Sequence, residues 1–390
     1  MMLSLAIVSL VIACLPAIMF AKNLPAFLFP VPSQEHKQNT DVADNSETLT
    51  DNSGRGGVSV LIPARDEQDG IASSVNAALR SQGVDVEVLV LDDHSADRTA
   101  QIVQEIADTD SRVRYLQGDE LPKGWNGKQF GCMQLSEAAK FSTLVFLDAD
   151  VRLQSDALQR LVICYDSIGV GLLSVFPHQE TESILEKWII PLMHYVLLGF
   201  CPLHRMRTDS SPALAAGCGQ LFMTNQEAYQ QAGTHAAICE SRHDGVKLPR
   251  AYREAGLMTD VYDGRELADC RMYHSAKEVI RGVLKNATEG LAGPKLIFPF
   301  TILLIGGSVL PLVLFALSMA LGDSVAAIVA CVAVLAGHFP RVLAATRLSQ
   351  SWLGVFCHAP ATLLFVILQW IAFLSHLAGR QVAWRGRTSS

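Results

Sequence analysis

Hydrophobic residues gather at the two ends of this 390-residue chain and leave a more polar middle. Residues 2–21 form an uncharged apolar run of about 20 residues, the length that a membrane-spanning helix needs. Three further apolar stretches lie near the other end, at residues 296–320, 324–340 and 353–377. The pattern predicts an anchor (1–22), a flexible polar linker (23–57), a folded domain (58–290), transmembrane helices (291–378) and a basic tail (379–390).

Charges beside the apolar stretches predict how the chain is oriented in the membrane. The first cation is Lys22, which follows the first run, whereas a cleaved signal peptide usually has a positive start. We therefore expect an uncleaved anchor with the folded domain in the cytosol, and Arg341 and Arg347 then also lie on the cytosolic side. A competing interpretation is that Val11-Ile-Ala-Cys14 is a lipoprotein processing site, which would export the domain.

The basic tail does not fit three full crossings. Arg380, Arg385 and Arg387 also favour the cytosolic side. Either the tail tolerates an outside location, or one stretch, such as the one broken by His358 and Pro360, is re-entrant.

Within the middle, short apolar runs alternate with segments of helical pattern. This alternation predicts an α/β fold with a mostly parallel sheet flanked by helices, because parallel strands need helical crossovers. The expected strands are residues 58–63, 86–91, 112–116, 144–147 and 221–224, and the expected helices are 69–81, one from about 97, 128–140, one from about 155 and 248–255.

Acidic residues follow three of the expected strands. Ligands of such sheets bind beyond the carboxyl ends of the strands, so Pro63–Glu67, Asp92–Asp93 and Asp148–Asp150 should converge on one edge. Asp148 and Asp150 project the same way from an extended backbone and could hold one hard cation. The alternative is that one acid caps the next helix and the other is solvated. The convergence predicts a nucleotide-diphosphate pocket. A dinucleotide or a P-loop nucleotide is disfavoured, because the sequence has no Gly-x-Gly-x-x-Gly after the first strand and no Walker-type loop.

The net charge and the cysteines bear on the binding partners and on the cellular compartment. A net charge of −7 without a basic stripe argues against nucleic acid. The nine cysteines contain no Cys-x-x-Cys pair, so we expect them to be small, buried hydrophobic side chains of a protein in a reducing compartment.

Three motifs in order, Ile62-Pro-Ala-Arg-Asp-Glu67, Leu91-Asp-Asp-His-Ser95 and Phe146-Leu-Asp-Ala-Asp150, resemble the family 2 glycosyltransferases of GT-A fold. The resemblance covers residues 58–290, with a nucleotide half at 58–150 and an acceptor half at 151–290. It implies a UDP-sugar donor and a Mn²⁺ or Mg²⁺ ion on its diphosphate. The implied donor-side residues are Pro63, Ala64, Glu67 and Asp92 or Asp93 around the uridine, Asp148 and Asp150 on the metal, and Lys128 facing the nucleotide or its phosphates. A solvated lysine at a helix start is the alternative for Lys128.

The resemblance also implies acceptor-side residues. Ala215–Gln220, with Gly217, Gly219 and Gln220, resembles the acceptor loop, although a plain tight turn is the alternative. Transfer to a hydroxyl needs a general base, and the resemblance assigns this role to Asp244. His243 stands where the family usually has an acid, and Asp244 could instead cap the helix that follows.

Downstream, only Arg281 matches the Gln-x-x-Arg-Trp motif of processive members, so a polysaccharide synthase is disfavoured. Segments 270–275, 285–290 and 382–387 look like bacterial membrane glycosyltransferases associated with carotenoid and hopanoid lipids. Residues 183–202 predict either a buried helix or an amphipathic helix in the bilayer surface.

Together these features predict an inverting, metal-dependent transferase that moves a sugar from a UDP-sugar to a lipid hydroxyl at the cytosolic membrane face. A processive polysaccharide synthase is the first alternative. A non-catalytic membrane scaffold that retains the nucleotide-sugar fold is the second.

Overall fold

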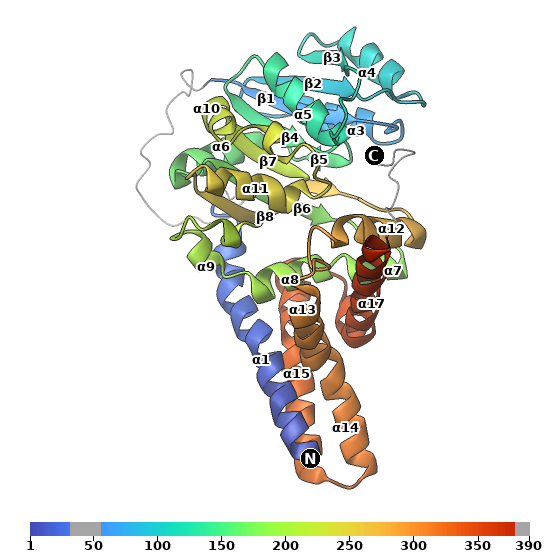
Figure 1. Ribbon diagram of the computed structural model, residues 1–390. Coiled ribbons are helices and arrows are strands. Elements are labelled where there is room, and N and C mark those ends of the chain that lie inside the picture. Colours follow the sequence, from blue (N-terminus) through green and yellow to red (C-terminus); the bar gives the residue numbers. More distant parts are fainter. Residues whose placement is uncertain (32–55, 379–390) are drawn as a thin grey trace. The chain divides into compact units, whose positions relative to one another are not determined.

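The computed structural model describes residues 1–31 and 56–378, which fold into two compact units (Figure 1). The sheet unit comprises Leu28–Glu180 and Met206–Arg271, and the helical unit comprises Met1–Phe27, Thr181–Arg205 and Met272–Ser390. Most of the predicted linker, the basic tail and its three arginines lie outside the described residues.

One eight-stranded sheet, in the order β3-β2-β1-β4-β7-β6-β8-β5, forms the sheet unit. Strands β1 to β4 pair in parallel, whereas β7 is antiparallel to both β4 and β6, and β5 is antiparallel to β8. The predicted mostly parallel α/β sheet is therefore confirmed, with an antiparallel strand inserted in its middle. The strands are β1 (Val58–Ala64), β2 (Val86–Asp92), β3 (Val113–Gln117), β4 (Thr143–Leu147), β5 (Val151–Leu153), β6 (Leu172–Gln179), β7 (Leu221–Asn225) and β8 (Thr259–Cys270).

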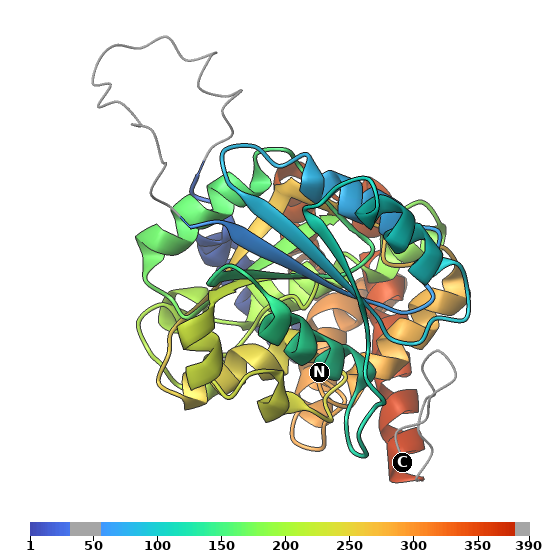
Figure 2. The same ribbon diagram turned by 90° about the horizontal axis from the view of Figure 1, so that it is seen from above.

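Helices cover both faces of this sheet, as Figure 2 shows. The cover is needed because β2 is buried at every position and β1 at all but Pro63, so neither strand has a solvated face. Leu89, Phe146 and Tyr252 belong to the buried cluster between sheet and helices. The helices are α3 (Ile71–Leu79), α4 (Thr99–Ala107), α5 (Gly127–Ala138), α6 (Ala157–Ile168), α10 (Gln226–Gln231) and α11 (Asp244–Glu254), with short 3₁₀ turns η1 (Pro212–Leu214) and η2 (His235–Ile238).

Among the described residues, four segments of the helical unit are long and apolar enough to cross a membrane: Met2–Phe27, Ile297–Ala320, Ser324–Arg347 and His358–Leu377. They are the four segments expected from the sequence, and the first helix continues to Phe27. In order, the helices are α1 (Met2–Phe27), α7 (Ile184–Ile189), α8 (Leu192–Phe200), α9 (Leu203–Met206), α12 (Ala276–Ala287), α13 (Ile297–Leu304), the π-helical turn η3 (Ile305–Val309), α14 (Leu310–Ala320), α15 (Ser324–Arg347), α16 (Trp352–Phe356) and α17 (His358–Leu377).

Residues 183–202 form two short helices, α7 and α8, that break at Pro191. Ile189 and Tyr195 pack in one buried cluster with Leu304 and Val366 of the apolar helices. One side of these helices is thus buried, as the first alternative expects, while Ile184 and Met193 are exposed.

Candidate functional site

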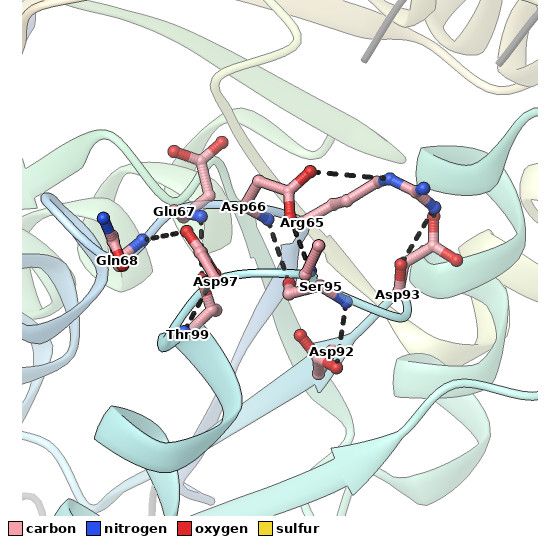
Figure 3. A network of polar contacts seen from close by, with 10 residues as sticks. Arg65, Asp66, Glu67, Gln68, Asp92, Asp93, Ser95, Asp97 and Thr99 are labelled. Atoms are coloured by element: carbon pink, nitrogen blue, oxygen red, sulfur yellow. Dashed lines mark hydrogen bonds and ion pairs between the residues drawn. The ribbon is translucent and has the colours of Figure 1, made fainter. Parts of the chain in front are cut away.

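The first part of the site lies where β1 and β2 end side by side. Ala64 pairs with Asp92 in the parallel ladder, and the Asp93 amide donates to the Ala64 carbonyl oxygen at 2.8 Å. Beyond the strands, the amide of Glu67 donates to the Thr99 hydroxyl at 2.8 Å, so the loop after β1 is fastened to the start of α4. Figure 3 shows this network, with the Glu67 carboxylate turned away from it. The predicted convergence of these two strand ends is thus present.

The two neighbouring acids after β2 have different surroundings. Asp93 binds the Arg65 guanidinium through its carboxylate at 3.3 Å and its carbonyl oxygen at 3.0 Å. Asp92 is buried, and its Oδ2 accepts the Ser95 amide at 3.3 Å, whereas its Oδ1 has no hydrogen-bond partner. A buried acceptor without a partner is costly, so Asp92 is the better placed of the two to receive a donor from a ligand.

Backbone strain marks the same loops. Asp66 and His94 have positive φ angles of 53° and 54°, a region that residues other than glycine rarely occupy. Hydrogen bonds compensate this cost, since the Asp66 carboxylate accepts the Ala96 amide at 2.8 Å. The turn after β1 and the turn after β2 thus stabilise each other through hydrogen bonds.

The second part of the site follows β4. The Asp148 amide donates to the Gln220 carbonyl oxygen at 3.0 Å, which ties this strand end to the loop before β7. Asp150 has a buried Oδ1 without a partner. Burial, and then the charges of the Asp148 and Glu67 carboxylates, raise the pKa of Asp150 to about 7. The segment after β1 lies beside this acid pair, because a Cβ at Gly70 would be 3.6 Å from the Ala149 carbonyl oxygen.

These residues fit a divalent cation. Two carboxylates stand close together, and one of them has a buried oxygen that no protein group satisfies. Residues 1–31 and 56–378 contain no group of three or more candidate metal ligands. A cation held here would therefore complete its shell with substrate oxygens and water, as Mg²⁺ commonly does.

Lys128 connects the acid pair to the candidate base. The residue lies in the first turn of α5, where the Asn126 side chain caps the helix. Its Nζ contacts Asp148 Oδ1 at 2.5 Å, Asp244 Oδ2 at 2.7 Å and the Gly219 carbonyl oxygen at 3.1 Å. Burial opposes its charge, but the two carboxylates raise the pKa of Lys128 well above its usual value. Lys128 is not simply a solvated lysine, because it bridges two acids.

Asp244 is the first residue of α11 and is almost completely buried. One carboxylate oxygen accepts the Gly245 amide at 2.8 Å and the other binds Lys128. Burial works against ionisation, yet the Lys128 ammonium lowers the pKa of Asp244 below its usual range. Asp244 therefore both supports its helix start and presents an ionised oxygen to the site.

Glycines allow the acceptor loop to pack against Asp244. A Cβ at Gly219 would overlap the Asp244 carboxylate, and a Cβ at Gly217 would come within 2.9 Å of the Ser174 hydroxyl. Gly245 is equally confined, because a Cβ there would meet the Gly217 carbonyl oxygen at 2.9 Å. The glycines of this loop serve close backbone approach.

Gln220 occupies a different position from the one its predicted acceptor role suggests. Its side chain is buried, donates to Cys270 Sγ at 2.8 Å and accepts the Gln179 amide at 2.7 Å. These two hydrogen bonds attach the loop before β7 to β8 and β6. Cys270 and Gln179, which sequence reasoning did not single out, lie on β8 and β6, and the length of the segment 259–270 between two helices was the signal that could have revealed β8.

Arg281 lies on α12 of the helical unit, and its side chain is exposed. The other predicted site residues all lie in the sheet unit: Pro63, Ala64, Glu67, Asp92, Asp93, Lys128, Asp148, Asp150, Gly217, Gly219, Gln220 and Asp244.

Comparisons with known proteins agree with this architecture. Residues 59–227 match the model of glycosyl transferase family 2. The 4,4'-diaponeurosporenoate glycosyltransferase of Staphylococcus aureus (strain N315) is 31% identical over 255 residues, which cover 64% of this chain and 65% of that relative, slightly less than two thirds. The homologous enzyme of strain USA300 is 31% identical over 244 residues, covering 61% of this chain and 62% of its own length.

Among solved structures, mannosyltransferase PcManGT from Pyrobaculum calidifontis, in complex with GDP-Man and Mn²⁺, aligns with a TM-score of 0.53. It shares 15% identity over 96% of this chain and 99% of that one, a likeness of fold. Residues 59–227 are thus similar to glycosyl transferase family 2, and the fold resembles that of a solved glycosyltransferase.

Proposed function

We propose that the protein is a membrane-bound, inverting glycosyltransferase that moves a sugar from a UDP-sugar to a lipid at the cytosolic membrane face. The observation that carries the proposal is the single ammonium group of Lys128, which contacts both the donor-side acid Asp148 and the candidate base Asp244. A sugar between these two carboxylates would have its leaving group on one side and its acceptor on the other. The S. aureus relatives act on a carotenoid, by their name, which supports a lipid acceptor.

On the donor side, Asp92 would accept a hydrogen bond from an N–H group of the uracil through its unpartnered Oδ1. Pro63, Ala64 and Glu67 would line the same uridine pocket, and Ala64 pairs with Asp92 in the sheet. Asp148 and Asp150 would hold Mn²⁺ or Mg²⁺. Such a cation supplies charge that offsets the leaving diphosphate. The Mn²⁺ and GDP-Man of the solved mannosyltransferase support this assignment.

On the acceptor side, Asp244 would take the proton of a lipid hydroxyl as its oxygen bonds to C1 of the sugar. The C1–O bond to the diphosphate breaks in the same displacement, and the UDP leaves with the bonding electrons. Lys128 would bind the diphosphate and so release Asp244 Oδ2 for the incoming proton. The glycines of the loop before β7 let Asp244 stand next to Lys128.

The name of the S. aureus relatives supports a second candidate acceptor, a lipid carboxylate. A carboxylate is already ionised at neutral pH, so its attack on C1 needs no base. The two acceptors therefore differ in their need for Asp244. Replacing Asp244 with Asn should stop transfer to the alcohol and spare transfer to the acid.

The test is an assay of the purified, detergent-solubilised protein with a panel of UDP-sugars, Mn²⁺ and a matched pair of lipid alcohol and lipid acid. We expect one UDP released for each singly glycosylated lipid, and no release in excess EDTA. Long sugar polymers as products would instead identify a polysaccharide synthase. Absence of UDP binding by calorimetry would leave only a non-catalytic scaffold.

A further inference from the structure

Among the described residues, one buried arginine of the helical unit has no negative partner. Arg341 of α15 is 1% exposed, yet its Nε and Nη2 have no hydrogen-bond partner. Its Nη1 reaches Gln350 Oε1 at 3.5 Å, the limit of a hydrogen bond. In the described part of the chain, no carboxylate forms an ion pair with it. A buried guanidinium in this state is strongly unfavourable.

The unpartnered nitrogens are the two that matter for anion binding. Nε and Nη2 form one edge of the guanidinium, and two parallel N–H groups on one edge match the oxygens of a phosphate or carboxylate. This edge points toward Gly354 of α16, because a Cβ there would lie 2.5 Å from Nη2. The same Cβ would lie 2.6 Å from the Lys187 carbonyl oxygen. Gly354 itself therefore adds no side-chain atom beside Nη2.

Three other polar side chains of this unit contact one another. His358 Nε2 lies 3.0 Å from the Ser308 hydroxyl, and Tyr195 Oη lies 3.3 Å from that same hydroxyl. None of these groups carries a negative charge. The charge of Arg341 is therefore balanced by none of them.

Arg341 lies near the C-terminal end of α15. At 1.5 Å per residue, α15 rises roughly 25 Å from Ser324 to Arg341, which is near the edge of a hydrocarbon core about 30 Å thick. The short helix α16 follows α15 and exposes Trp352, Leu353 and Phe356, as segments in the membrane interface do. If α15 spans the membrane, this rise would place Arg341 at the level of lipid head groups.

From these observations we propose that Arg341 binds the phosphate of an anionic phospholipid head group. The phosphate would enter beside Gly354 as α16 moves outward, and would accept hydrogen bonds from Nε and Nη2. The exposed apolar side chains of α16 would stay in the lipid during this movement. The site is independent of the sugar-transfer reaction and ties the protein to the composition of its membrane.

The test uses the full chain in nanodiscs of phosphatidylcholine, with or without phosphatidylglycerol. Arg341→Met removes the proposed ligand, and Arg347→Met, at the exposed end of the same helix, removes the same charge as a matched control. We expect phosphatidylglycerol to raise the Tm of the wild type and of Arg347→Met by several degrees, and to leave that of Arg341→Met unchanged. An equal rise in all three proteins would overturn the proposal.

Two further measurements keep the proposal testable if Arg341→Met does not fold. Native mass spectrometry of the wild type should show phosphatidylglycerol retained in preference to phosphatidylcholine, and Arg341→Lys should retain less. Inorganic phosphate added to neutral nanodiscs should not reproduce the shift in Tm; if it does, the site binds an oxyanion but not a lipid. Calorimetric UDP binding by Arg341→Met should match the wild type, so the outcome does not depend on the proposed transferase.

Discussion

Replacing Lys128 with Met should destabilise the protein in the absence of a divalent cation. Its Nζ contacts Asp148 at 2.5 Å and Asp244 at 2.7 Å, so the two carboxylate oxygens are no further apart than the sum of these distances. Two unit charges about 5 Å apart repel by roughly 3 kcal/mol at an effective dielectric constant near 20. The methionine side chain fills similar space but leaves this repulsion uncompensated.

The expected loss is smaller than the sum of repulsion and lost ion pairs. The side chains are 31%, 28% and 12% exposed for Lys128, Asp148 and Asp244, so water screens part of the charge, and one carboxyl group can take up a proton. We expect a decrease of about 2–3 kcal/mol in the free energy of unfolding, equivalent to roughly 5–10 °C in Tm.

The assay is thermal unfolding of the detergent-solubilised protein in EDTA and in Mn²⁺, with Lys123→Met as the control at an exposed lysine. Mn²⁺ should restore part of the Tm of Lys128→Met, because a cation held by Asp148 and Asp150 would offset the negative charge of Asp148 and so weaken its repulsion of Asp244. If Lys128→Met and Lys123→Met unfold at the same temperature in EDTA, the bridging role of Lys128 is refuted.

Two other predictions concern the same unit. In Gly219→Ala the new Cβ would displace the Asp244 carboxylate, so turnover should fall by about 10²-fold while UDP binding is retained. The control Gly56→Ala, where a Cβ meets nothing, should behave as the wild type. Equal turnover in both variants would contradict the packing argument. Burial raises the pKa of Asp263 from 3.8 to about 6, so its stabilising contribution is present below pH 4 and is lost as the pH rises through 6. Asp263→Asn should therefore exceed the wild type in Tm at pH 8 and match it at pH 4, and an equal difference at both pH values would rule this out.

The half of the sheet with continuous apolar strands could be predicted from the sequence. β1, β2 and β4 are buried along nearly their whole length, so their residues form uninterrupted apolar runs that end on polar turns. β8 was not predicted, because it buries Asp260 and Asp263. These acids pair with Arg207 and Arg265, contacts that a single sequence does not reveal.

The same distinction holds for the site. The prediction brought Asp92, Asp148 and Asp150 to one edge, because the carboxyl ends of parallel strands lie at the same edge of a sheet whatever the order of the strands. The link from Lys128 to Asp244 joins residues far apart in the chain and depends on how α11 packs against the loop of Gly219. Arg341 was interpreted as a topological signal, and nothing in the local sequence indicates its burial.

Asp244→Asn tests the central claim most directly, that one carboxylate activates the acceptor in a site whose other acids serve the donor. The measurement compares turnover with a lipid alcohol and calorimetric binding of UDP with Mn²⁺ in the same preparation. We expect turnover to fall by at least about 100-fold while the affinity for UDP stays close to that of the wild type. Turnover equal to that of the wild type would contradict the assignment of Asp244 as the base.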